Sequence, residues 1–299
     1  MKLIQSLDVG NTLGEGVIWD ARRQRIWWTD IESCKLFRCD PMTNELEQWS
    51  TPERLSCLAP VAGSERMVVA FESGFAFFSP ETEQIEWIEK LELDNPGTRM
   101  NDGRTDRQGR FWAGSMVEDR NKFTYKGSLY CLDHSQRVSR HLQGLSITNS
   151  LCWNFDGTVM YHGDSPKRSI QKYQFDPETG QASCEGNFVT TDPDCFPDGS
   201  CIDAEGCLWN AQWGGAKIVR YSPSGRVDLE LKVPVSQPSC VAFGGVDLNL
   251  LIVTSAKQGL SKSQLEQQPQ AGNLLIYHTP FRGLIDTEYK SNSANTNTS

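Results

Sequence analysis

The chain has 299 residues, which is long enough for one large all-β domain whose hydrophobic core needs no disulfides. Asp and Glu number 38 against 29 Lys and Arg, and the net charge of -9 repels phosphate backbones and anionic lipid, so neither nucleic acid nor a membrane is expected as a partner. The N-terminus has no signal-peptide pattern, no apolar run reaches about 18 residues, and the ten cysteines form no Cys-x-x-Cys pair, so we expect a cytoplasmic protein with reduced thiols.

One short pattern returns six times along the chain. Each copy has a polar turn that begins with Asp or Gly, followed by an aliphatic or aromatic strand. The strands are anchored at Ile26, Met67, Phe111, Met160, Leu208 and Leu251, which lie 41 to 49 residues apart. A four-stranded propeller blade needs about 40–50 residues. Further strands are expected across polar turns at 35–39, 171–175 and 218–221, and no long stretch has a helical period.

The repeat predicts an all-β fold, a six-bladed β-propeller with four-stranded blades. A β-sandwich would not repeat one signature six times, and a β-helix would repeat at a shorter interval. We expect the N-terminal strand at 3–9 to pair with the strand at 272–277 and so to close the ring in the last blade. Residues 1–290 are predicted to form this single domain, as a monomer or weak dimer. Residues 291–299 contain only Ser, Asn, Thr and Ala, and are predicted to be a disordered tail.

No familiar catalytic framework is present in the sequence. There is no Gly-x-Ser-x-Gly elbow, no phosphate-binding glycine loop, no His-Glu-x-x-His and no dinucleotide fingerprint. The four histidines are widely spread. Any chemistry must therefore rest on carboxylates, amides and arginine, and such groups favour a hard cation such as Ca²⁺, Mg²⁺ or Mn²⁺, with Zn²⁺ also possible.

Four polar residues share one position within their repeats. Glu15, Asn101, Asn149 and Asp198 precede the strand anchors of their own repeats by 10 or 11 residues. The first strand of a propeller blade lines the central channel, so these four side chains are expected to converge on the axis. Each one considered alone is better explained as a turn residue. Their common register favours a shared site.

The chain also resembles a known family in five ordered segments, which are GEGVIW at 14–19, RMNDGRTDRQGRFWAGSM at 99–116, ITNSLCW at 147–153, PDGSCIDAEG at 197–206 and QPQAG at 268–272. Across residues 13 to 283 they are similar to the SMP-30/gluconolactonase/regucalcin family. The resemblance implies a propeller hydrolase with one divalent metal ion (Ca, Zn, Mn or Mg) on its axis. By the same resemblance, Glu15, Asn149 and Asp198 would be the metal ligands, and Asp198 would also be the general base.

The resemblance also implies substrate-binding residues. Arg99 and Asn101 would bind the sugar hydroxyls and ring, although Arg99 considered alone could be a surface salt-bridge partner. An acidic residue after the Ala-Gly-Ser-Met stretch contacts substrate in the family. Asp119 is the closest match and Glu118 stands beside it, and the sequence leaves open which of the two has this role.

Three further residues bear on the predicted site. Trp213 is a candidate wall for the sugar, and a core role is as plausible for it. Ser150 stands where the family usually has Gly, and Val17 where it often has Pro. Neither change removes a functional group.

The predicted reaction is hydrolysis of a small sugar lactone to its acid. A lactone is an ester, so its hydrolysis needs a polarised carbonyl, an activated water and a place for the developing oxyanion, and a metal ion with a carboxylate base supplies these. Aldonolactones of the gluconolactone, galactonolactone or L-arabinonolactone type are the expected substrates. Two alternatives stay open, namely an esterase of the same fold for non-sugar esters or organophosphates, and a non-catalytic calcium-binding propeller.

Overall fold

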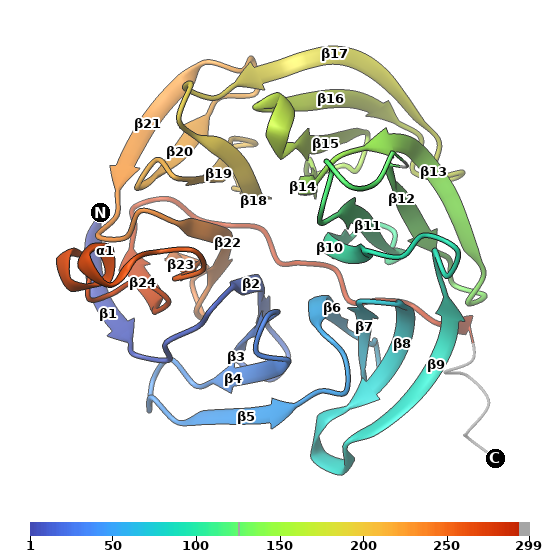
Figure 1. The fold of residues 1–299 in the computed structure, drawn as a ribbon, viewed down its shortest axis with the longest axis horizontal. Helices are drawn as coiled ribbons and strands as arrows, with labels where there is room; N and C mark the ends of the chain where they lie inside the picture. The colour runs from blue at the N-terminus through green and yellow to red at the C-terminus, as the bar shows by residue number, and fades with distance from the viewer. Residues whose placement is uncertain (125, 293–299) are drawn as a thin grey trace.

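Six four-stranded antiparallel sheets surround a central axis in the computed structural model, which describes residues 1–124 and 126–292 (Figure 1). The six-bladed propeller is therefore confirmed. The first three blades, each written from the innermost strand outward, are β2 (Gly14–Asp20), β3 (Arg25–Asp30), β4 (Lys35–Cys39) and β5 (Leu46–Ser50); β6 (Leu55–Pro60), β7 (Met67–Phe71), β8 (Gly74–Ser79) and β9 (Gln84–Lys90); and β10 (Thr98–Thr105), β11 (Phe111–Val117), β12 (Gly127–Leu132) and β13 (Val138–Leu145).

The other three blades follow the same order. They are β14 (Thr148–Trp153), β15 (Val159–Asp164), β16 (Ser169–Phe175) and β17 (Ala182–Thr190); β18 (Phe196–Ile202), β19 (Leu208–Trp213), β20 (Lys217–Tyr221) and β21 (Val227–Lys232); and β22 (Pro238–Gly244), β23 (Leu250–Ser255), β24 (Leu274–His278) and β1 (Lys2–Leu7). Within the described residues, the helical elements are α1 (Lys262–Gln267) and the short 3-10 turns η1 (Pro80–Thr82) and η2 (Ser165–Lys167). None of these helices is long and apolar enough to span a bilayer.

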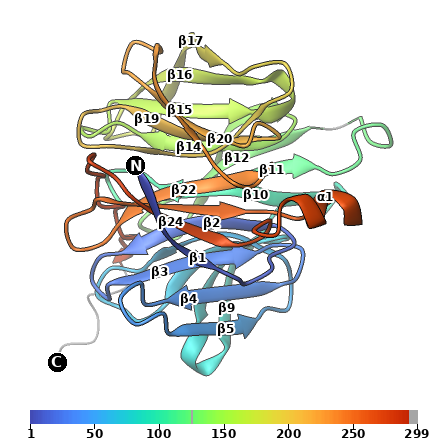
Figure 2. The same ribbon diagram turned by 90° about the vertical axis from the view of Figure 1, so that its left-hand side faces the viewer.

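The N-terminal strand closes the ring, as predicted. β1 pairs antiparallel with β24, with Leu3 opposite Tyr277, and so completes the blade that contains β22 and β23. Figure 2 shows β1 beside β24 in the blade that faces the viewer. Because the first and last parts of the chain share one sheet, the propeller has no gap between its ends.

In two of the six repeated turns, an aspartate bonds both the turn and a core tryptophan. Asp106 accepts hydrogen bonds from turn amides and from the indole Nε1 of Trp112 at 2.8 Å. Asp203 plays the same part in its own turn and accepts from Trp209 Nε1 at 2.8 Å. One carboxylate thus stabilises the turn and satisfies the indole of a fully buried tryptophan. The predicted core tryptophans are buried between the blades, namely Trp27, Trp28, Trp112, Trp153 and Trp209.

All six inner strands have a β-bulge near the end at which they start. In β2 the register shifts between Glu15 and Ile18, and in β14 it shifts between Asn149 and Cys152. Equivalent shifts occur in β6, β10, β18 and β22. A bulge changes the direction of the local side chain, and the bulged ends of β2, β10, β14 and β18 carry the polar residues that line the axial cavity.

Ser150 occupies the bulge of β14 in a left-handed conformation, with φ of 57°. This conformation favours glycine, which is the usual residue of the family at this position. The serine hydroxyl donates to the Asp198 carbonyl at 2.6 Å and accepts from Asn210 Nδ2 at 3.1 Å. These two hydrogen bonds offset the backbone strain, so the departure from the family pattern leaves the bulge intact.

A C-terminal segment, residues 279–292, crosses the ring on the side opposite the bulges (Figure 1). Asp286 pairs with Arg104 near the end of β10 at 2.7 Å, and the amide of Tyr289 donates to the Pro60 carbonyl at the end of β6. The amide of Asn292 donates to the His134 carbonyl in the third blade. The sequence analysis did not foresee this strap. The rest of the predicted disordered tail, 293–299, lies outside the described residues.

Candidate active site

A cavity of about 290 Å³ opens on the axis at the end where the inner strands start. Five of the residues singled out in the sequence line it together, namely Glu15, Arg99, Asn101, Asn149 and Asp198. Its remaining walls are largely apolar and come from Leu13, Met116, Ile147, Pro166, Phe196 and Trp213. The shared register of these polar residues therefore corresponds to one place in space.

Glu15 and Asp198 form a buried pair of carboxyl groups. They come from β2 and β18, are 8% and 6% exposed, and lie near enough for each to shift the pKa of the other. Burial, followed by the nearby Asp102 carboxyl, raises the pKa of Glu15 to about 8, against the opposing effects of the Gly16 amide and Arg99. Burial, followed by repulsion from Glu15, raises the pKa of Asp198 well above its usual range. Two such groups can both ionise only when a positive charge lies between them.

A divalent cation fits this pair of carboxyl groups. Carboxylate oxygens are the preferred ligands of hard cations, and Asn149 adds an amide oxygen in the same cavity. Asn149 Nδ2 donates to Ser165 Oγ at 2.7 Å, so its Oδ1 is turned the other way, toward Asn101. Two carboxylates and an amide oxygen would therefore be the protein ligands of the cation.

Asp102 is a third buried carboxyl near the axis, and the sequence analysis did not single it out. It accepts hydrogen bonds from the amides of Gly103 at 2.9 Å and Leu151 at 3.0 Å, and these bonds connect the bulges of β10 and β14. Burial raises its pKa. Its position next to Asn101 was the only signal in the sequence, and an Asn-Asp-Gly run is also typical of an ordinary turn.

Arg99 lies inside the cavity, with a side chain that is 6% exposed. Its Nη1 donates to the Met100 carbonyl at 2.9 Å and to Asn101 Oδ1 at 2.7 Å, while its buried Nε has no hydrogen-bond partner among the described residues. Its pKa is lowered by burial and by the neighbouring charge of Arg54. The alternative of a surface salt-bridge partner does not describe a side chain buried to this extent, although its Nε lies 3.8 Å from the Glu118 carboxylate.

Glu118 and Asp119, the two candidates for an acidic substrate contact, do not line the cavity. Glu118 accepts from Arg54 at 2.6 Å and lies 3.8 Å from Arg99 Nε, so it acts as a counter-ion to both arginines. Asp119 is exposed and accepts from the amides of Asn121 and Lys122 in a turn. The role of either residue toward substrate stays a prediction.

Other cavity residues were missed by the sequence analysis. Arg120 and Gln258 line its mouth, and Ser165 lines its wall. Arg120 has no hydrogen bond or ion pair within the part of the chain that the structure describes. No repeat pattern could identify these residues, because they lie on connections outside the inner strands. Trp213, for which two roles were open, also lines the cavity.

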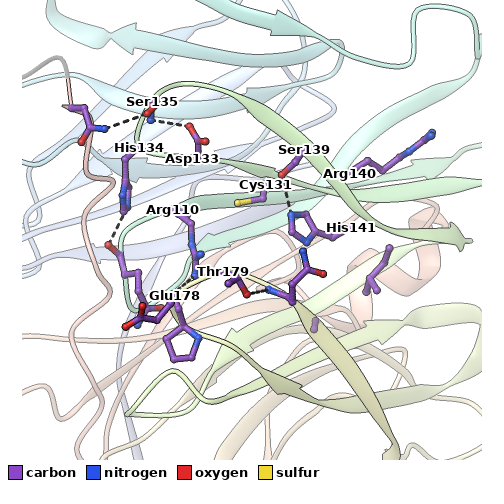
Figure 3. Close-up of a pocket in the computed structure, with 16 residues that line it drawn as sticks. Arg110, Cys131, Asp133, His134, Ser135, Ser139, Arg140, His141, Glu178 and Thr179 are labelled. Atoms are coloured by element: carbon purple, nitrogen blue, oxygen red, sulfur yellow. Dashed lines mark hydrogen bonds between the residues drawn. The ribbon is translucent and has the colours of Figure 1, made fainter.

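A larger groove of about 710 Å³ lies on the outer rim between the third and fourth blades (Figure 3). In it, Ser139 Oγ lies 2.9 Å from His141 Nε2, but no carboxylate among the described residues hydrogen-bonds to this histidine. Arg110 is committed to Asp106, and Asp133 accepts from the amides of its own turn. The groove thus lacks the facing carboxyl groups of the axial cavity, which is the better candidate site.

The fold and the cavity define a propeller protein with a polar, carboxylate-rich site on its axis. The chain belongs to the family described as "SMP-30/Gluconolactonase/LRE-like region", whose model matches residues 13–257. It is 37% identical over 283 residues to the L-arabinolactonase of Azospirillum brasilense, covering 94% of this chain and 93% of the relative. It is 32% identical to the 6-deoxy-6-sulfogluconolactonase of Pseudomonas putida, covering 88% and 89%.

A solved structure agrees with this assignment. The calcium-binding protein regucalcin from Agrobacterium tumefaciens superposes with a TM-score of 0.90 at 29% identity, covering 96% of this chain and 97% of that one. The family suggested by the sequence segments is therefore confirmed.

Proposed function

We propose that this chain is a metal-dependent sugar lactonase that hydrolyses an aldonolactone to its acid. The observation that carries the proposal is the buried Glu15–Asp198 pair, which shares its cavity with Asn149, Arg99 and Asn101. Relatives at 37% and 32% identity are named for their action on lactones, which supports a hydrolase acting on lactone esters.

The proposed cofactor is one divalent cation held by Glu15, Asn149 and Asp198. When bound, it would polarise the lactone carbonyl and stabilise the developing negative charge. Ca²⁺, Mn²⁺, Mg²⁺ and Zn²⁺ all suit two carboxylates and an amide oxygen. The name of the Agrobacterium protein supports a cation in this family.

Asp198 is the proposed general base. Its carboxylate would accept a proton from the water that attacks the carbonyl carbon, and this assistance is typically worth about 10²–10⁴-fold in rate. As the ring C–O bond breaks, the same proton can return to the ring oxygen, which leaves as a hydroxyl. The products are then the open-chain acid and its free hydroxyl, and no other reactant is needed. A carboxylate beside a cation is a weak base, but lactones of sugars are activated esters.

Arg99 and Asn101 are proposed to hold the sugar. The Arg99 guanidinium lines the cavity and can donate to ring or hydroxyl oxygens, and the Asn101 amide has both donor and acceptor groups. The apolar walls at Leu13, Ile147 and Phe196 limit access of bulk water to the reacting ester. The proposed partner is therefore a small polyhydroxylated lactone.

The test uses purified protein loaded with Mn²⁺, Zn²⁺ or Ca²⁺ and a panel of aldonolactones, with acid release followed by a pH indicator. Release well above the spontaneous rate for at least one sugar lactone, absent after chelation, is the expected result. A phosphotriester and a non-sugar lactone in the same panel measure the esterase alternative. Bound metal without acid release from any compound would instead indicate a non-catalytic calcium-binding propeller.

A further inference from the structure

A chain of hydrogen bonds runs along one side of the axial cavity. Arg99 Nη1 donates to Asn101 Oδ1 at 2.7 Å, and Asn101 Nδ2 donates to Asn149 Oδ1 at 3.2 Å. Asn149 Nδ2 donates to Ser165 Oγ at 2.7 Å, and Ser165 Oγ donates to the Pro197 carbonyl at 2.8 Å. The chain connects the inner strands β10, β14 and β18.

The group at each end of this hydrogen-bond chain can have only one hydrogen-bonding role. A guanidinium can only donate and a backbone carbonyl can only accept. The Arg99 end therefore makes Asn101 present its oxygen to Arg99 and its Nδ2 to Asn149. The Pro197 end takes the single hydroxyl hydrogen of Ser165, which leaves Ser165 Oγ as an acceptor. The Asn149 amide must then point Nδ2 to Ser165, which leaves its oxygen on the opposite side.

The backbone around Ser165 does not itself require a hydroxyl. In the first blade, Asp30 accepts from the amides of Thr12 and Leu13, and Ile31 follows it with its amide bonded to the Leu13 carbonyl. In the fourth blade, Asp164 accepts in the same way from the amides at 146 and 147, and the Ser165 amide bonds to the carbonyl at 147. Ser165 and Ile31 thus hold equivalent positions. The blade that carries Asn149 has the hydroxyl, and the blade that carries Glu15 needs none, because both oxygens of a carboxylate are equivalent.

We infer that Ser165 is a positioning residue that keeps the Asn149 oxygen turned toward the bound cation. The inference rests on the proposed cation site. Without the hydroxyl, only the longer 3.2 Å bond from Asn101 Nδ2 would hold the amide, and a rotated amide would present its NH₂ group, which cannot bind a cation. Groups that orient metal ligands typically change metal affinity by about 10–100-fold when they are removed.

The experiment measures Mn²⁺ binding to metal-free full-length protein by titration calorimetry and by the electron paramagnetic resonance signal of free Mn²⁺. Ser165→Ala should weaken binding by about 10–100-fold. Ser165→Thr, which keeps a hydroxyl, should restore most of the affinity, and Ser165→Val should not. The matched control is Ser56→Ala, which removes another buried hydroxyl, on the inner strand β6, whose acceptor is the Ala70 carbonyl, and it should leave binding unchanged.

A second background separates orientation from general structure. Asn149→Asp replaces the amide by a group with two equivalent oxygens, so Ser165→Ala should cost much less affinity in that background. Equal losses in both backgrounds, or no loss in the Asn149 background, would overturn the role of Ser165 while leaving the cation site intact. No Mn²⁺ binding by the unsubstituted protein would overturn both. The Thr and Val variants keep the test decisive if the alanine variant does not fold.

Discussion

Binding of a divalent cation at the axial site should release protons, and the number can be worked out from the Glu15–Asp198 pair. The pKa of Glu15 is raised to about 8, mainly by burial. At pH 7, one unit lower, about nine tenths of the Glu15 groups carry a proton. Asp198, whose pKa is also raised well above its usual range, adds a further fraction. A cation requires both groups as carboxylates, so about one to two protons should leave for each ion bound.

The same linkage sets the pH dependence of affinity. While one proton is displaced per ion, the apparent affinity falls about tenfold for each pH unit below the pKa. Half of the Glu15 groups are already protonated at pH 8, so binding at pH 6 should be about 50-fold weaker than at pH 8. At pH values where Asp198 is also protonated, the metal affinity depends more steeply on pH.

Titration calorimetry with Mn²⁺ in buffers of different ionisation enthalpy counts the released protons directly. Glu15→Gln is the matched variant, because it keeps the shape of the side chain and removes one titrating group. Its proton release at pH 7 should fall by about one per ion. Proton release near zero in the unsubstituted protein, with Mn²⁺ bound, would refute the account of two buried protonated carboxyl groups.

Three further predictions concern activity and stability. Asp198→Asn should lower kcat by about 10²–10⁴-fold even at saturating Mn²⁺, because it removes the base; a normal rate would show that another group takes the proton. Between about pH 6.5 and 8, the metal-free protein should lose stability as pH rises, since folded Glu15 keeps a proton that its ordinary pKa of 4.5 would release. His162, whose pKa burial lowers to about 4, has the opposite effect, but that effect ends near its ordinary value of 6.5. Thermal unfolding should show this slope, and Glu15→Gln should reduce it. Asp286→Ala should cost about 3 kcal/mol in denaturant unfolding, because it strands the Arg104 guanidinium, whose side chain is 8% exposed. In an Arg104→Met background the same change should cost far less, and equal losses in both backgrounds would contradict the pairing.

The repeat predicted the architecture because each blade needs the same local structure, a tight polar turn followed by a buried strand. A turn that begins with Asp or Gly and leads into an apolar strand has a physical role wherever it occurs, as the bonds from Asp106 to its turn amides and to Trp112 show. Interactions within one turn involve residues that are close in the sequence, so the sequence pattern can predict them. The closing strand was predictable for a related reason, since a propeller must pair its ends.

The convergence of Glu15, Asn149 and Asp198 could be predicted only from their common position within the repeats. Their equal offsets within the repeats placed them at one level, and the bulges that turn them inward follow the same repeat. The positions of Glu118 and Asp119 could not be predicted in this way. They lie on a connection outside the repeat, where Arg54, far away in the sequence, decides which way Glu118 turns.

By itself, the sequence determined the number of blades, their order and four polar residues of the axial site, because these depend on local patterns that recur every 41 to 49 residues. Only the tertiary structure decided the rest. The raised pKa values of Glu15 and Asp198, the orientation of Asn149 by Ser165 and the strap that pairs Asp286 with Arg104 all come from groups that are separated in the sequence and meet only in the folded chain. Burial and hydrogen-bond direction depend on every neighbour in space, and these neighbours exist only once the ring has closed.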